Sequence, residues 1–286
     1  MPFGKDGLTG SLMTCPLTYI PLWYIIVTMG IIIFFFGLVF GSFANVVILR
    51  LPKGKSLVTP GSTCPSCGKA IRFYDNIPLL SYLLLRGKCR FCRKKISGRY
   101  FLVELLSGIL FLAMYAKFGI DARFFVYTLF AYSLLIVGFI DIDTFLISDV
   151  IVLPMVVLGL MFSILLPGMH NNLDARISGL YSFAGILLGA VLLVALSLFG
   201  KLLFRKDAMG GGDVKLLAMI GAFLGWKSIF LTIFFASLLG TVISLSLIAC
   251  KKKSIEDYVP FGPYLGLGAL ISLFYKGMTF MGFFIN

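Results

Sequence analysis

Long apolar runs separated by short polar segments dominate this sequence of 286 residues. Eight runs are bounded by charged or turn-forming residues, and they cover positions 23–48, 101–118, 124–140, 150–166, 179–203, 214–226, 229–250 and 262–285. A helix that crosses a membrane needs about 20 apolar residues, which most of these runs provide. The run after Asp213 is shorter, and we expect a tilted, re-entrant or fused helix there. The first run exceeds the apolar core of a cleaved signal peptide, so we expect it to be retained as a span.

The composition agrees with a chain that lies mostly in a membrane. Hydrophobic residues make up 59% and charged residues 13%, whereas an average soluble domain is about 25% charged. This scarcity of charge argues against a soluble globular enzyme, and the high hydrophobicity argues against a disordered chain. The sequence therefore predicts an all-α polytopic membrane protein with about eight transmembrane helices.

The basic residues are unevenly distributed, and their distribution predicts the topology. The formal net charge is +13, and twelve of the 25 basic residues lie between Arg50 and Tyr100. Two further clusters are Lys201, Arg205, Lys206 and Lys215, and Lys251, Lys252 and Lys253. The positive-inside rule places all three segments in the cytoplasm, where contact with anionic membrane lipid accounts for the charge. We expect no nucleic-acid partner, because no soluble module carries a basic face with interleaved aromatic residues.

Four of the six cysteines form two closely spaced pairs in the most basic segment. The pairs are Cys64-x2-Cys67 and Cys89-x2-Cys92, with 21 residues between them. Paired knuckles of this kind are typical of a tetrahedral zinc site, and four thiolates leave no open position for catalysis. Two disulfides are the alternative, which the reducing cytosol disfavours. The sequence predicts a structural zinc ion in a cytoplasmic four-cysteine zinc-binding loop domain.

Carboxylates are few, and two groups of them fall at the same predicted membrane edge. Asp141, Asp143 and Asp149 lie between the third and fourth runs, and Asp213 follows three glycines before the sixth. An ionisable group at membrane depth indicates a functional site. Two carboxyl groups in close proximity can hydrolyse a peptide, one taking a proton from water while the other polarises the carbonyl.

Structural roles compete with this interpretation at each acidic position. Asp149 after Ser148 is typical of a helix N-cap, Asp143 of a solvated loop charge, and Asp213 of an N-cap after a glycine linker. Glu104, near the start of the second run, is either an interfacial carboxylate paired with an arginine or a site residue. The residues alone leave these alternatives open.

Several motifs, taken together and in order, resemble those of the bacterial type IV prepilin peptidases, or leader peptidase/N-methyltransferases. They span positions 41–270, and they are Gly41-Ser42-Phe43-Ala44-Asn45, the four cysteines, Asp75-Asn76-Ile77-Pro78, Arg99-Tyr100 with Glu104, the Asp141 to Asp149 segment, Gly210-Gly211-Gly212-Asp213 and Pro260-Phe261-Gly262-Pro263. The resemblance implies a membrane aspartic protease of the Gly-x-Gly-Asp type, in which Asp141 and Asp213 are the catalytic pair.

The same resemblance implies substrates, a second reaction and a location. The substrates are type IV prepilins and pseudopilins of pilus and type II secretion systems, cleaved at the cytoplasmic side of the bacterial inner membrane. The new N-terminal residue is then methylated from S-adenosylmethionine by the cysteine-bearing loop, with Gly87 and Lys88 as contributors. The expected organisation is an N-terminal segment with the first span (1–49), the zinc-binding loop domain (50–100) and the peptidase domain (101–286).

Two other functions fit some of these features. A proton-coupled transporter or channel also carries membrane carboxylates and broken helices, and it predicts flux without peptide cleavage. A zinc-dependent docking module predicts loss of partner binding when zinc is removed. On the peptidase interpretation, Asp75, Asp143 and Asp149 are candidates for attracting the basic leader that the net charge of +13 repels.

Overall fold

Helices account for nearly all regular structure in this computed structural model, which describes residues 22–59, 61–64, 66–170, 174–204, 210–251 and 259–275. The α-helices are α1 (Leu22–Arg50), α2 (Leu80–Leu84), α3 (Gly98–Phe118), α4 (Ala122–Thr144), α5 (Asp149–Leu165), α6 (Ala175–Phe204), α7 (Gly211–Leu224), α8 (Trp226–Ala249) and α9 (Gly262–Phe274). Short 3₁₀ helices are η1 (Leu51–Lys53), η2 (Phe73–Asn76) and η3 (Pro167–His170). Two isolated β-bridges are the only extended pairing among the described residues. The all-α prediction is confirmed.

Eight of these helices coincide with the eight apolar runs, but they differ in length. Five helices, α1, α3, α4, α6 and α8, are long and apolar enough to cross a membrane, and α5 and α9 are shorter apolar helices. The chain is therefore a multi-pass membrane protein. The eighth run was expected to reach position 285, but residues after 275 lie outside the described part.

The sixth run forms the short helix α7, which is buried inside the bundle. Its 14 residues rise about 21 Å, less than the roughly 30 Å of a bilayer core. The helix is buried from Leu216 to Leu224, and Gly225, with a φ of 79°, separates it from α8. It is therefore a separate helix, enclosed by its neighbours, rather than an extension of α8.

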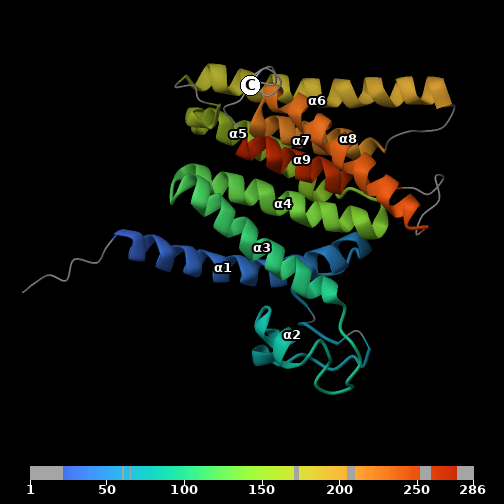
Figure 1. The fold of residues 1–286 in the computed structure, drawn as a ribbon. Coiled ribbons are helices and arrows are strands. Elements are labelled where there is room, and N and C mark those ends of the chain that lie inside the picture. The colour runs from blue at the N-terminus through green and yellow to red at the C-terminus, as the bar shows by residue number, and fades with distance from the viewer. Residues whose placement is uncertain are drawn as a thin grey trace, which may run out of the picture.

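The helices form two groups joined through α4. In Figure 1, α4 lies between the α1–α3 pair and the group that contains α5 to α9. Within that group, α7 packs against α5 and α6, while α9 packs against α4 and α8. The segment 51–97, which we call the cysteine domain, lies outside the bundle beside α1 and α3, on the side away from α6 (Figure 1).

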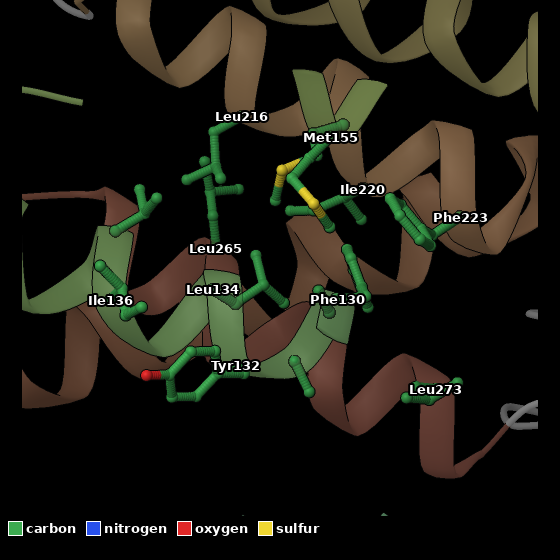
Figure 2. Close-up of a cluster of buried hydrophobic side chains, with 14 of the residues drawn as sticks. Phe130, Tyr132, Leu134, Ile136, Met155, Leu216, Ile220, Phe223, Leu265 and Leu273 are labelled. Atoms are coloured by element: carbon green, nitrogen blue, oxygen red, sulfur yellow. The ribbon is translucent and has the colours of Figure 1, made fainter. Parts of the chain in front are cut away.

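Buried side chains from α4, α5, α7 and α9 meet in one apolar core. Figure 2 shows this cluster, which includes Phe130, Leu134, Met155, Leu216, Ile220, Phe223 and Leu265. The rings of Phe130 and Phe223 stack with their centroids 4.7 Å apart. Asp141 follows the first ring by 11 residues and Asp213 precedes the second by 10, so each aspartate lies about 15–17 Å along its helix from this contact. The stacked pair thus joins α4 and α7, the two helices that carry Asp141 and Asp213.

Candidate active site

Asp141 lies in the last turn of α4 with its carboxylate held by the start of α9. The residue is 5% exposed, and its Oδ2 accepts a hydrogen bond of 2.9 Å from the backbone N–H of Gly262. Helix α4 ends at Thr144 because Phe145 adopts a left-handed conformation, with a φ of 53°. Gly262 is a site residue whose role the sequence did not indicate, although its motif between Phe261 and Pro263 was visible.

Asp213 is the third residue of α7 and is 9% exposed. Gly210 precedes the helix as its N-cap, and its carbonyl accepts a hydrogen bond of 3.2 Å from the Asp213 N–H. The N-cap interpretation of Asp213 is therefore wrong, because the glycines themselves begin the helix. Its carboxylate accepts a hydrogen bond from the backbone of Gly210 and interacts electrostatically with Asp141. The structure brings the two sequence-predicted aspartates together.

The start of α7, which carries Asp213, contacts the segment that follows Asp141 along the chain. A Cβ on Gly212 would lie 2.8 Å from the Cβ of Ile147, so only glycine permits this approach. Lys215 of α7 binds both oxygens of Asp149 at 2.7 and 2.8 Å. These contacts tie the start of α7 to the start of α5.

Asp149 is not the helix N-cap expected at its position, and Asp143 is not the loop residue expected at its own. Asp149 is the first residue of α5 and follows its N-cap, Ser148, so the N-cap interpretation of Asp149 is wrong. Asp143 lies in the last turn of α4 rather than in a loop, because the helix continues to Thr144, and it pairs with Arg99 at the start of α3. Both are half-buried or exposed, unlike Asp141.

The three carboxylates proposed to attract a basic leader all have basic partners. Asp75 forms a bidentate pair with Arg90, with distances of 2.6 to 3.0 Å, and that guanidinium lowers the pKa of Asp75. Asp143 pairs with Arg99 and Asp149 with Lys215. Because each negative charge is compensated locally, we no longer expect these residues to steer the leader.

Glu104 joins three parts of the molecule. Its Oε2 accepts a hydrogen bond of 2.8 Å from the backbone N–H of Leu79 in the cysteine domain. Its carboxylate also accepts a hydrogen bond from the Ser42 hydroxyl of α1. These hydrogen bonds replace the arginine partner considered for Glu104, and they dock the cysteine domain on α1 and α3.

The four cysteines of the two pairs converge in the cysteine domain. The Sγ atoms of Cys64, Cys67, Cys89 and Cys92 all lie within 4.8 Å of one another. Those of Cys64 and Cys92 are 3.9 Å apart, too far for a disulfide of about 2.05 Å. A zinc ion with Zn–S bonds near 2.3 Å holds tetrahedral sulfurs about 3.8 Å apart, so the four residues fit such an ion.

The two cysteine pairs share one backbone geometry, although the sequence has no recognisable repeat. In each knuckle the first cysteine donates to a carbonyl five residues later at 2.9 Å, namely that of Lys69 and that of Lys94. The residue after each second cysteine, Gly68 or Arg93, has a positive φ. Equivalent positions of the two knuckles are separated by 25 residues in the sequence. In the second knuckle, backbone N–H groups of Cys92 and Phe91 lower the pKa of Cys89, whereas burial and the neighbouring thiols raise the pKa of Cys92. Such donors stabilise a thiolate, the form that binds metal.

Gly87 and Lys88 connect α2 to the second cysteine pair. Gly87 has a φ of 66°, and a Cβ on it would lie 2.9 Å from the Tyr82 ring and hydroxyl. Its carbonyl accepts a hydrogen bond of 2.7 Å from Ile96, and Lys88 forms a β-bridge with Lys95. The Gly87 backbone therefore packs directly against the side chain of Tyr82.

Replacing Gly262 by Ala should strongly impair the site without unfolding the bundle. The added Cβ would lie 2.7 Å from Asp141 Oδ2, which must move and lose the Gly262 hydrogen bond. We expect any reaction that uses Asp141 to slow by about a hundredfold, as for a misplaced catalytic group. Gly266→Ala is the matched control in α9, since its Cβ would meet only ordinary contacts at 3.8 Å. Equal rates for both variants would contradict this positioning role.

Comparison with known proteins identifies the family. Residues 35–118 match the bacterial peptidase A24 N-terminal domain, and residues 128–245 match the type IV leader peptidase family. The chain is 36% identical over 260 residues to the prepilin leader peptidase/N-methyltransferase of Pseudomonas aeruginosa, covering 83% of this chain and 87% of that protein. It is also 36% identical over 266 residues to the protein of the same name from Aeromonas hydrophila, covering 85% and 89%. No solved structure matches the chain significantly. The chain therefore belongs to the type IV leader peptidase family.

Proposed function

We propose that this protein is a membrane-embedded aspartic endopeptidase and N-methyltransferase that acts on type IV prepilins and pseudopilins. The observation that carries the peptidase activity is the pairing of two buried aspartates, Asp141 and Asp213, at one end of the bundle. The relatives that are 36% identical to this chain over 260 and 266 aligned residues are named for both activities. The reactions take place at the cytoplasmic side of the bacterial inner membrane, where the positive-inside rule puts the cysteine domain.

Cleavage requires the two carboxyl groups to share one proton. Two neighbouring, buried carboxyl groups do not both stay ionised, so one is protonated and the other is not. The ionised group takes a proton from the attacking water, and the protonated group donates a hydrogen bond to the scissile carbonyl. The Gly262 N–H and the backbone of Gly210 hold the two carboxylates in place during this exchange.

The substrate's apolar helix packs laterally among the spans while its basic leader stays in the cytosol. This arrangement lets an apolar pilin helix remain in lipid until its first residues reach the aspartates. The compensated charges of Asp75, Asp143 and Asp149 mean that the leader is recognised by position rather than by local attraction.

On this proposal the chain is divided into an N-terminal segment with the first span (1–49), a methyl-transfer domain (50–100) and a peptidase domain (101–286).

Zinc would be held by the four cysteines and would stabilise the cysteine domain. Four sulfurs complete a tetrahedral coordination sphere, so the ion supplies structure rather than chemistry. The transporter interpretation is not favoured, because the relatives of this chain are named as peptidases.

One assay tests both activities of the proposal. The purified protein is incubated with a prepilin and isotopically labelled S-adenosylmethionine, and the products are weighed by mass spectrometry. We expect the leader to be released and the new N-terminal residue to gain one labelled methyl group. An intact prepilin together with ion flux in proteoliposomes would favour the transporter instead.

Replacing Gly87 by Ala should reduce methyl transfer while sparing cleavage. The new side chain would both strain the positive φ and collide with Tyr82, so we expect methylation to fall at least about tenfold. Gly54→Ala is the matched control, because Gly54 has a similar φ of 61° but open space around it. Methylation and cleavage are read from the same intact-mass spectrum. An equal loss of methylation in both variants would assign the effect to backbone strain alone.

A further inference from the structure

A cavity of about 300 Å³ lies where the cysteine domain meets α1 and α3. Its aromatic walls are formed by Tyr82, Phe91, Tyr100 and Phe101. The ring centroids of Tyr82 and Phe101 lie 5.4 Å apart. Ser42 and Glu104 line its membrane side, and Cys64 and Cys89 line the side of the cysteine cluster. Its size falls within the range of small-molecule sites, about 300–1,000 Å³.

The charged groups around this cavity are unequally compensated. Asp75 and Arg90 neutralise each other, and Arg50 donates to the carbonyls of Ser56 and Gly61. Among the described residues, Glu104 receives hydrogen bonds only from uncharged groups, the Leu79 N–H and the Ser42 hydroxyl. Lys69 lies 5.1 Å from the centroid of the Phe91 ring, in the cysteine domain. The cavity therefore has a carboxylate on its membrane side, a cation on its other side and aromatic faces between.

A second cavity connects the aromatic cavity with the end of α4. This second cavity of about 320 Å³ shares Asn45 and Tyr100 with the first and extends to Arg99. Arg99 pairs with Asp143, which follows Asp141 by two residues. The side-chain amide of Asn45 donates to the Tyr100 carbonyl at 3.1 Å and so forms part of the wall between the two cavities. Arg99 thus links the second cavity to the last turn of α4, the turn that also carries Asp141.

We propose that this aromatic cavity binds S-adenosylmethionine, with the Glu104 carboxylate facing its positive sulfonium group. The inference rests on the methyltransferase part of the proposed function and names the site of that reaction. An adenine ring suits the aromatic walls, a sulfonium suits a carboxylate, and the amino-acid carboxylate of the ligand suits Lys69. Gly87 acts on this site through Tyr82, the wall that its backbone supports.

The transfer that this site would host balances without another co-reactant. The new N-terminal ammonium loses one proton to water, and the freed amine forms a bond to the methyl carbon. The carbon–sulfur bond breaks, and its electron pair stays on sulfur, which leaves as a neutral thioether. Because the ligand loses its positive charge, the Glu104 carboxylate holds the donor more tightly than the product.

Isothermal titration with S-adenosylmethionine and with S-adenosylhomocysteine, the product that has lost the methyl group, tests the proposal without relying on turnover. Val46 lines the cavity, so Val46→Phe should weaken S-adenosylhomocysteine binding at least about tenfold. Val39, two turns earlier on α1 and 58% exposed, provides the control Val39→Phe, which should bind normally. Glu104→Gln keeps a hydrogen-bond acceptor for Leu79 but removes the charge. It should reduce the preference for S-adenosylmethionine over S-adenosylhomocysteine at least about fivefold.

Photo-cross-linking of labelled S-adenosylmethionine to the wild-type protein gives a second measurement that needs no variant. We expect the labelled peptides to come from the segments that line the cavity, namely residues 42–50, 62–64, 69–77, 81–91 and 96–104. Label confined to other segments, or equal binding by Val46→Phe and Val39→Phe, would overturn the proposal. A wild-type protein that methylates pilin but is labelled elsewhere refutes the cavity alone. A wild-type protein that neither cleaves nor methylates refutes the proposed function itself.

Discussion

Asp141→Asn and Asp213→Asn should each slow leader cleavage by roughly a thousandfold or more, the scale of a lost acid–base group. Asparagine preserves the size of the side chain, but it cannot exchange the proton that the carboxyl pair must share. Both aspartates are buried, and the mechanism uses both carboxyl groups, so the remaining aspartate cannot replace the one that is lost. Single-turnover cleavage of a prepilin in detergent, followed by intact mass, measures the effect.

Asp143→Asn and Asp149→Asn are the matched controls for this prediction. Both residues lie within nine positions of Asp141, and both are paired with basic side chains outside the dyad. We expect their cleavage rates to stay within about tenfold of the wild type, because exposed ion pairs contribute roughly 0–1 kcal/mol. Cleavage by Asp141→Asn or Asp213→Asn at the rate of these controls would exclude the carboxyl pair as the catalyst.

Removing the metal should unfold the cysteine domain and abolish methyl transfer while cleavage persists at a reduced rate. Structural zinc contributes about 10–16 kcal/mol in small cysteine sites, far more than a domain of this size gains from its few buried apolar residues. Cys64 and Cys89 also line the aromatic cavity, so their movement would destroy it. We expect Cys64→Ser to lose its zinc by elemental analysis and to become sensitive to proteolysis between residues 51 and 97.

Cys250→Ser provides the control for the metal prediction. Cys250 is a free, exposed cysteine after α8 and lies outside the four-cysteine cluster. Its replacement should leave zinc content and both activities unchanged. If Cys64→Ser kept its zinc and its methyl transfer, the four-cysteine site would not be the structural element assigned to it.

The features predicted best from the sequence were those encoded by short-range spacing. Apolar runs predicted eight helices because a helix in lipid must be apolar along its whole length. The cysteine spacing predicted the cluster of four sulfurs for a similar reason, since each knuckle places two thiolates locally. Asp141 and Asp213 were selected because carboxylates are rare in such a chain.

The features that the sequence did not predict depend on residues that meet only in the folded protein. The Gly262 hydrogen bond to Asp141 joins positions 121 residues apart, and no local pattern encodes it. Asp143 was expected in a loop because the end of α4 depends on the left-handed Phe145, a conformation that phenylalanine rarely adopts. The burial of α7 likewise follows from packing by α5 and α6, which run length alone does not reveal.

We propose that one chain carries two separate sites near one end of its bundle, an aspartate pair for cleavage and a cysteine domain for methylation. The Asp213→Asn variant is incubated with labelled S-adenosylmethionine and either an intact prepilin or an already processed pilin. The mass of each pilin product is then measured. We expect the prepilin to stay intact and the processed pilin to gain one methyl group. Cleavage of the prepilin, or an unmethylated processed pilin that the wild-type protein does methylate, would contradict this proposal.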